Sequence, residues 1–364
     1  MKTLMAAILL LLVSVQSNAC DQYLRKYTKD CQFQDRVRRL KTQMKSKGVN
    51  LDEIAEYRVM RFIDRNSWES AKKDKRAPIN IYNPKPDTWQ VWDAGIRKIF
   101  VSKQLNGILY RGFKLDRDMF ANMNLVLLTD GNRSIKDPIT DQKKKPGQFR
   151  VDKDLGVGFC NPGVANSVPE LEKSKRSVER FQQAWEKRVG YTFDQLARRK
   201  NATDAESATF VVNMSQSAHP TCSGKNSWVN YAPTAEVQKN LEWMKIFIEA
   251  NLKYYSQDKA MLSPIELATF VQKWFVSIHP FSDGNGRTSR AVQDILLANF
   301  DLPFAPAGDL YVDATAEVET YVQQTYAKMD AMLTVLESCA KIDYKLPVSK
   351  RPFYCATTAE LNSL

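Results

Sequence analysis

The most regular hydrophobic pattern in the chain lies between residues 264 and 278. Apolar side chains recur there every three or four positions, as they do on one face of a helix. Ser263 and Glu266 form a capping box ahead of it, with Pro264 in the first turn. Pro280 disfavours a continuation of the helix through His279. We therefore predict a helix over 264–278 whose single buried face consists of Leu267, Phe270, Val271, Trp274, Phe275 and Ile278.

Helical spacing also dominates most of the remaining chain, and strand patterns are few. Two short apolar segments, 208–215 and 227–233, predict a small β-hairpin. Pro- and Asn-rich residues over 76–87 mark a boundary near residue 80, and 129–147 is a polar loop. The sequence thus predicts a mainly α protein, with helical segments over 21–48, 51–73, 89–128, 169–189, 235–255 and from about residue 287 onward.

The first 19 residues have the pattern of an export signal. Lys2 precedes an apolar run over 6–15 in which Ser14 is the one polar residue, and Ser17-Asn18-Ala19 is typical of a cleavage site. A run of this length is too short to cross a bilayer, which takes about 20 residues. We interpret 1–19 as a cleaved signal peptide of a secreted or periplasmic protein. Cleavage would leave Cys20 first, and its lipidation is the one route by which we expect membrane attachment.

The cysteine content and the charge bear on the compartment of the protein and on its partners. The six cysteines, at 20, 31, 160, 222, 339 and 355, fit up to three disulfides of an exported protein, with no pairing fixed by their spacing. Residues 20–200 hold 39 Lys and Arg against 23 Asp and Glu, a net charge of +16, within a chain of +12. Such a surface fits an anionic partner or simple solubility. No Arg-aromatic pattern favours nucleic acid, so we expect none.

The segment His279-Pro-Phe-Ser-Asp-Gly-Asn-Gly-Arg-Thr-Ser-Arg290 carries the candidate chemistry. The Gly284-Asn285-Gly286 turn lets backbone N–H groups approach a ligand, and the following helix N-terminus attracts anions. Arg287 and Arg290 share a helical face and supply two permanent positive charges for phosphate oxygens.

Two further side chains of this segment complete a phosphate-handling site. Asp283 fits a Mg²⁺ ligand, because Mg²⁺ takes one or two carboxylates together with phosphate oxygens. His279 stands at the helix end, where a general base would take a proton from a hydroxyl group. The only other histidine is His219, which excludes a multi-histidine metal centre.

These twelve residues match the signature of the Fic family, His-Pro-Phe-x-(Asp/Glu)-Gly-Asn-Gly-Arg-x-x-Arg, at every fixed position. The segment from Asn230 to Ile248 is similar to the Tyr-x-Pro stretch and helix that precede the motif in that family. Pro146–Arg150 is similar to the stretch that leads to its substrate-binding flap, and "LANFDLP" after the motif is also typical. The resemblance implies a helical Fic domain over 89–345 with an insertion at about 151–228. A basic helical extension would precede it (20–88) and a tail would follow (346–364).

The resemblance also implies an activity, the transfer of AMP from ATP to a protein hydroxyl. His279 would be the base, and Asp283 would hold Mg²⁺. Gly284, Asn285 and Gly286 would cradle the phosphates, and Arg287 and Arg290 would bind the outer ones. The target protein would dock on a flap near 209–231.

Two positions depart from the family pattern. Many members restrain themselves through a Ser/Thr-x-x-x-Glu-Gly/Asn helix whose Glu occupies the second motif arginine. Thr315 and Glu319 come close to that pattern but are followed by Thr320, so Glu319 is only a weak candidate for pairing with Arg290. Asp294 stands where Asn is frequent, which leaves the contacts on the adenine side open.

Three interpretations therefore remain. The first is an exported protein adenylyltransferase that acts as an effector. The second keeps the scaffold but uses another donor, such as UTP or CDP-choline. The third is a basic exported protein that only holds an anion in the loop.

Overall fold

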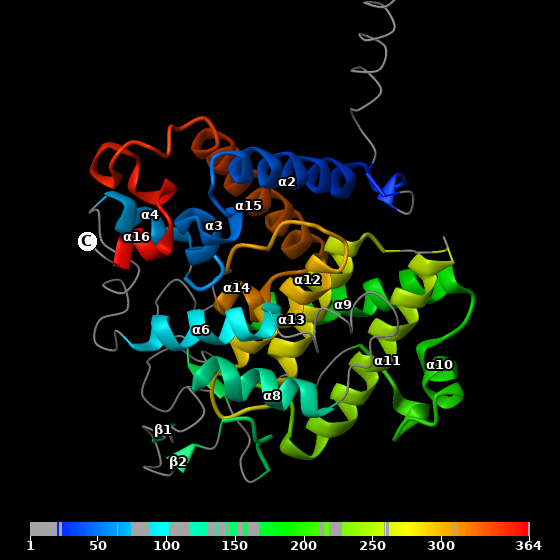
Figure 1. Ribbon diagram of the computed structural model, residues 1–364. Coiled ribbons are helices and arrows are strands. Elements are labelled where there is room, and N and C mark those ends of the chain that lie inside the picture. Colours follow the sequence, from blue (N-terminus) through cyan, green and yellow to red (C-terminus); the bar gives the residue numbers. More distant parts are fainter. Residues whose placement is uncertain are drawn as a thin grey trace, which may run out of the picture.

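The computed structural model confirms a mainly α-helical protein (Figure 1). Helices surround one central helix, and the strands are few and short. The structure describes residues 20–21, 24–63, 65–73, 87–101, 117–129, 135–136, 143–144, 146–151, 156–158, 167–210, 215–217, 228–257, 259, 262–308 and 310–362.

The regular elements follow the predicted segments closely in the second half of the chain. The helices are α2 (Thr28–Ser46), α3 (Ala55–Val59), α4 (Arg65–Lys73), α6 (Asp87–Val101), α8 (Arg117–Leu128), α9 (Ser167–Val189), α10 (Phe193–Arg199), α11 (Val237–Ser256), α12 (Pro264–Ile278), α13 (Asn285–Ala298), α14 (Leu310–Thr315), α15 (Val318–Cys339) and α16 (Thr358–Asn362). Single 3₁₀ turns are η2 (Leu51–Glu53), η4 (Ala205–Ser207), η5 (Thr234–Glu236), η6 (Val348–Lys350) and η7 (Phe353–Cys355).

Helix α12 is the centre of the fold. It begins with the predicted capping box, in which the Ser263 hydroxyl accepts from Glu266 N and the Glu266 carboxylate accepts from Ser263 N. The sequence predicted one buried face, but every residue of the helix except Glu266 is buried. The reason is that α11, α13, α14 and α15 all pack against it. Its polar positions find partners in these neighbours, and Lys273 donates to the Asp313 carbonyl at 3.0 Å.

Residues 167–210, which lie within the segment predicted as an insertion, belong to the same hydrophobic core. Trp185 of α9 meets Phe193, Phe210 and Phe247 edge to face, with ring centroids 5.6–6.2 Å apart. Phe210 in turn packs on Phe270 of α12. Residues 167–210 therefore support the central helix from one side.

The stretch 51–73, predicted as helical, is divided rather than continuous. Ile54 is extended and forms an isolated β-bridge with Thr357, and Ala55 N donates to Ala356 O at 2.8 Å. These contacts with a segment 300 residues later separate η2 from α3 and α4, and no local pattern could indicate them. The predicted break at 76–87 lies outside the described residues, apart from the start of α6.

Among the described residues, two disulfides occur near the two ends of the chain, Cys20–Cys31 and Cys339–Cys355. The first engages the Cys20 sulfur, so that sulfur is not available to a lipid anchor while the bond exists. The second holds η7 against the end of α15, beside the Arg351–Glu360 ion pair of 2.5 Å. Cys160 and Cys222 lie outside the described residues, as does the segment 1–19. Within the part that the structure describes, no helix is long and apolar enough to cross a membrane.

The strands form two small sheets. Strands β1 (Ile135–Lys136) and β2 (Lys143–Lys144) pair antiparallel within the predicted polar loop. In the second sheet β5 (Trp228–Asn230) lies between β3 (Gly156–Gly158) and β4 (Ser215–Ser217), antiparallel to both. Strand β5 agrees with the predicted segment 227–233. Strand β4 begins where the predicted segment 208–215 ends, and residues 211–214 lie outside the described part.

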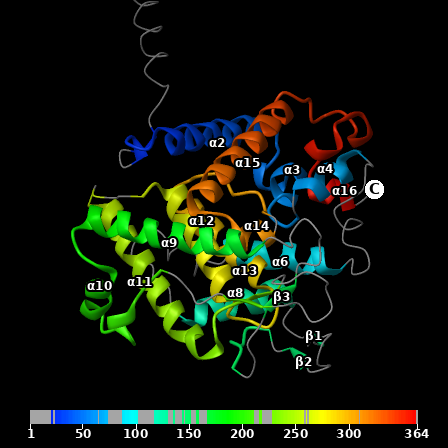
Figure 2. The same ribbon diagram turned by 180° about the vertical axis from the view of Figure 1, so that it is seen from behind.

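The buried carboxylate of Asp30 connects helix α2 to helix α12. It crosses α15 (Figures 1 and 2), and its Asp30 is fully buried. Asp30 accepts hydrogen bonds from Ile265 N at 3.0 Å, in the first turn of α12, and from the Tyr326 hydroxyl at 2.5 Å. Burial raises the pKa of Asp30 from 3.8 to about 6, although both hydrogen bonds oppose the shift.

Because its pKa is raised on folding, Asp30 makes the free energy of unfolding depend on pH. A carboxyl whose pKa is raised on folding binds its proton more tightly in the folded state. The contribution of Asp30 to the free energy of unfolding therefore grows as pH falls from about 6 to about 4. Asp30→Asn should remove a stability gain on the order of 2 kcal/mol over that interval. The measurement is urea unfolding at several pH values with disulfides intact. Asp35→Asn, on the same helix but partly exposed, should keep the gain; equal pH slopes for wild type and Asp30→Asn would contradict the prediction.

Candidate functional site

The segment 279–290 forms the connection between α12 and α13. Helix α12 ends at Ile278, and His279 adopts the left-handed conformation with φ 51° while its N–H still bonds to Phe275 O. Helix α13 begins at Asn285, preceded by Gly284 with φ 77°. The two predicted helices are thus present and are joined by a short turn. The first backbone N–H groups of α13 lie at that turn.

The turn is closed by Asn285 rather than by its glycines alone. The Asn285 side chain accepts from Phe281 N at 2.9 Å and donates to Phe281 O at 2.7 Å. This side chain, predicted to cradle phosphates, is therefore occupied in holding the loop. Gly284 is required by its positive φ and by close packing, because a Cβ there would lie 2.8 Å from Leu128 and 2.9 Å from the Asn124 amide nitrogen.

Asn124 of α8 is a supporting residue that the sequence reasoning missed. Its amide nitrogen donates to Asp283 O at 3.0 Å and to the Thr288 hydroxyl at 3.2 Å, and its oxygen accepts from Gly147 N at 2.9 Å. One buried side chain thus joins the turn, the first turn of α13 and the segment before Arg150. A lone Asn inside an amphipathic helix gives no sequence signal for such a role.

Arg150 fixes the C-terminal end of α12. Its guanidinium donates to the carbonyls of His279 (2.7 Å), Ile278 (3.1 Å) and Ala232, and to the Thr234 hydroxyl (3.0 Å). Orphan carbonyls at a helix end need such donors when they are buried. The neighbouring Phe149 stacks on Phe281 with ring centroids 5.1 Å apart. The 146–150 stretch, noted from the sequence as a lead into the flap, is here also the support of the histidine.

His279 stacks on an aromatic ring, and the Arg150 guanidinium donates to its backbone carbonyl. The Tyr231 ring lies parallel to the imidazole, with centroids 3.7 Å apart and 9° between planes. The Nδ1 atom is enclosed and has no hydrogen-bond partner among the described residues. Desolvation, with the Arg150 charge second, lowers the pKa of His279 from 6.5 to about 3. The imidazole is therefore neutral at neutral pH.

The predicted metal ligand and phosphate ligands surround the turn. Asp283 is partly exposed, with Oδ1 accepting from Gly284 N at 2.6 Å and lying 3.9 Å from an Arg287 nitrogen. The Arg290 guanidinium folds over the turn, since a Cβ on Gly286 would lie 3.4 Å from its Nη1. The structure thus brings Asp283, Arg287 and Arg290 to one turn, next to the helix end that carries His279.

The donor set fits a Mg²⁺ held mainly by a nucleotide. No cluster of three or more His, Cys, Asp or Glu that could bind a metal occurs in the described ranges. Asp283 alone would supply one carboxylate oxygen, and the remaining ligands would be phosphate oxygens and water. That is the usual arrangement for Mg²⁺ at phosphate sites.

Glu319 does not pair with Arg290. Its side chain is 57% exposed and lies 3.7 Å from Arg180 of α9, so this candidate from the sequence is wrong. Two buried carboxylates interact electrostatically with Arg290, Asp294 of α13 and Asp313 of α14. Asp313 also accepts from the Tyr321 hydroxyl at 2.5 Å. Burial raises the pKa of Asp313, and the Tyr321 hydrogen bond and the Arg290 charge oppose that shift.

Asp294 is part of a buried ion pair. Its Oδ2 accepts from Arg61 Nε at 2.7 Å, and both side chains are at most 3% exposed. The Arg61 guanidinium lies 3.6 Å above the ring centre of Phe304. Asp294 therefore fastens α13 to Arg61, which follows α3 in the chain.

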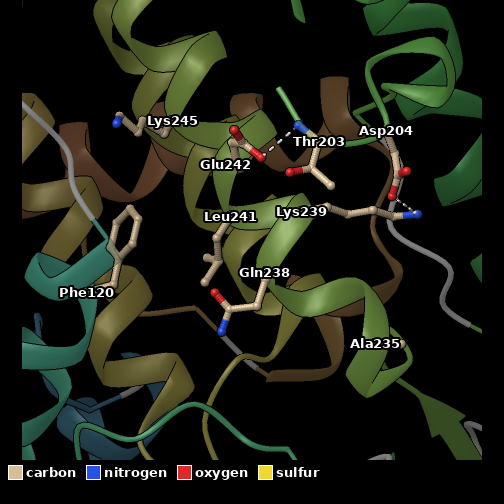
Figure 3. A pocket seen from close by; sticks show the side chains of 9 residues that line it. All are labelled: Phe120, Thr203, Asp204, Ala235, Gln238, Lys239, Leu241, Glu242 and Lys245. Carbon is tan, nitrogen blue, oxygen red and sulfur yellow. Dashed lines mark hydrogen bonds and ion pairs between the residues drawn. The ribbon is translucent and has the colours of Figure 1, made fainter. Parts of the chain in front are cut away.

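A cavity of about 410 Å³ lies beside α11, between α8 and η4 (Figure 3). Phe120 and Leu241 face it from opposite sides, and its rim carries the Lys239–Asp204 ion pair of 3.6 Å. Phe120 contacts Phe275 of α12 edge to face. None of the residues that line this cavity belongs to 279–290, so it is separate from the turn.

Residues 225–297, which include the whole turn, match the model of the Fic/DOC family. A Fido domain-containing protein of Dictyostelium discoideum is 31% identical over 84 residues, 22% of this chain and 59% of that protein, so the match spans less than two thirds of the relative. A crystal structure of a Fic domain-containing signaling protein from Bacteroides thetaiotaomicron aligns with 86% of this chain and 97% of its own. Its TM-score of 0.44 and 13% identity are too low to carry an argument. The sequence matches support a Fic/Fido domain around the turn.

Proposed function

We propose that the protein transfers AMP from Mg-ATP to a Tyr, Ser or Thr hydroxyl of a target protein. The observation that carries the proposal is that the candidate base, the candidate phosphate ligands and the candidate metal ligand lie together at the end of α12. A neutral, half-buried imidazole with an enclosed Nδ1 atom there adjoins a helix N-terminal turn with two arginines and one carboxylate. The Fic/DOC match of the same residues supports nucleotide transfer as the general class of reaction.

The transfer is a displacement at the α-phosphorus of ATP. His279 accepts the proton of the target hydroxyl as its oxygen forms a bond to the α-phosphorus. The bond from that phosphorus to the bridging oxygen breaks, and pyrophosphate leaves with the electron pair. The proton on His279 then passes to solvent.

The groups around His279 position the nucleotide and stabilise charge. The Arg287 and Arg290 guanidiniums and the first N–H groups of α13 bind phosphate oxygens. Asp283 would hold Mg²⁺, which neutralises phosphate charge. The negative phosphates also raise the pKa of His279 from its low value in the free protein, which makes it a stronger base. The target segment docks on the sheet of β3, β5 and β4, next to Tyr231.

A labelling experiment distinguishes the donors. The protein, with disulfides intact, is mixed with candidate lysates, Mg²⁺ and ATP labelled at either the α- or the γ-phosphate, with parallel reactions containing UTP or CDP-choline. We expect label from α-ATP and none from γ-ATP. Label only from UTP or CDP-choline would establish the same scaffold with another donor. No label combined with no nucleotide binding would leave only an anion-binding protein.

We also propose that the protein acts after export. Support comes from the signal-like segment 1–19 and from the two disulfides of the described residues, since disulfides persist in oxidising compartments. ATP would then be met at the destination, such as a recipient cell. Robust modification of the producer's own cytosolic proteins in the native setting would contradict this proposal.

A further inference from the structure

A basic groove lies between the second half of α2 and the end of α15. Its volume is about 460 Å³. Four cations line it, Arg36, Arg39, Lys47 and Lys341, against the single carboxylate of Glu337. The two helices cross at this place in both views of the molecule (Figures 1 and 2).

The only acidic side chain in the lining is already neutralised. Glu337 accepts two hydrogen bonds from Arg36, at 2.7 and 3.2 Å, and Arg36 also binds Asp330. Lys47 donates to a main-chain carbonyl, that of Ile342, at 2.7 Å. No carboxylate of the described residues lies within ion-pair distance of Lys47 or Lys341. Arg39 is also paired, with Asp35 of the same helix at 3.0 Å. The positive charge that remains in the groove is therefore that of Lys47 and Lys341, which an anionic partner would balance.

The shape of the groove favours a protein segment as the partner. Residues 36 to 47 follow one another along α2 over about 16 Å, which matches roughly five residues of extended chain. The buried side chains of Leu40 and Ala340 form an apolar floor between the cations. A flat bilayer would touch only the rim, and the lining has no aromatic ring on which a base could stack.

We propose that this groove docks a short acidic segment of a partner protein, with one apolar side chain among its carboxylates. The site is remote from the motif. Asp30 of α2 contacts the first turn of α12, and His279 lies at the opposite end of that 15-residue helix, about 22 Å away. Docking at the groove therefore leaves the turn at 279–290 accessible and needs no nucleotide.

The test measures binding of a labelled peptide, Glu-Glu-Leu-Asp-Glu, by fluorescence anisotropy without ATP. We expect binding that weakens with salt, and a loss of about tenfold or more in Lys47→Glu/Lys341→Glu. Lys187→Glu/Lys200→Glu is the matched control, with the same charge change on exposed positions of α9 and after α10. This control should retain affinity within about twofold. Lys47→Gln/Lys341→Gln should lose an intermediate amount, and thermal unfolding verifies that each variant is folded.

Three outcomes would overturn the proposal. They are no peptide binding by the wild type, an equal loss in both double variants, and a groove-dependent preference for other anions. The last is measured with vesicles of phosphatidylcholine and phosphatidylserine and with a 20-base-pair DNA duplex. Failure of AMP transfer would not affect these results, because the binding assay contains no nucleotide.

Discussion

His279→Ala should abolish AMP transfer while Mg-ATP binding persists. The proposed phosphate ligands are the α13 N-terminus, Arg287 and Arg290, and none of these depends on the imidazole. Loss of a general base costs about 10²–10⁴-fold in rate. The measurement is incorporation of α-labelled ATP into the target, alongside ATP titration by calorimetry. Tyr231→Phe is the matched control, because it removes only a hydroxyl that lacks a partner among the described residues and keeps the stacked ring.

Three results would contradict this role. Wild-type labelling by His279→Ala would exclude the imidazole as the base. Loss of ATP binding together with labelling would make His279 a structural part of the turn. A Tyr231→Phe variant as inactive as His279→Ala would shift the chemistry toward the phenol.

The same substitution changes the acid stability of the protein. A histidine whose pKa is lowered on folding contributes stability above its unfolded value of about 6.5, and this is lost as pH falls toward 3. The unfolding free energy of His279→Ala should therefore fall less steeply between pH 6.5 and 4 than that of the wild type. Parallel curves would contradict the lowered pKa.

Arg150→Met should destabilise the protein and also raise the pKa of His279. The variant leaves the carbonyls of Ala232, Ile278 and His279 without their buried donor, which costs about 3 kcal/mol or more. It also removes the positive charge that helps to lower the pKa of His279, so that pKa should rise. The measurements are urea unfolding and titration of the histidine resonances by NMR. Only His219 and His279 contribute, and His279→Ala identifies which signal is which.

Arg150→Lys separates the two effects. It keeps the charge but loses the planar fork that reaches several acceptors at once. We expect a loss of stability with the pKa of His279 still low. Unchanged stability in both variants would mean that the helix end does not depend on Arg150. A rise of the pKa in Arg150→Lys equal to that in Arg150→Met would mean that charge is not the cause.

The local parts of the site were predictable because they depend on neighbours in the chain. The capping box of α12 and the glycine before α13 involve residues at most three or four positions apart. Such contacts leave a readable pattern, and so does the helical spacing that gave the mainly α fold. The burial of every α12 residue except Glu266 was not predictable, because the polar side chains of Gln272 and Lys273 bond to partners from α13, α14 and α15.

The sequence by itself determined the helices of the second half, the turn at 279–290 and the residue types that could bind phosphate. Only the tertiary structure decided what holds them. Asn124 reaches Thr288 across 164 positions, Arg150 reaches His279 across 129, and Asp30 reaches Ile265 across 235. It also decided that Glu319 faces Arg180, and that Cys20 pairs with Cys31. The physical reason is that a helix or turn forms through contacts close in sequence, whereas a buried polar atom accepts whichever distant partner the packing brings within reach.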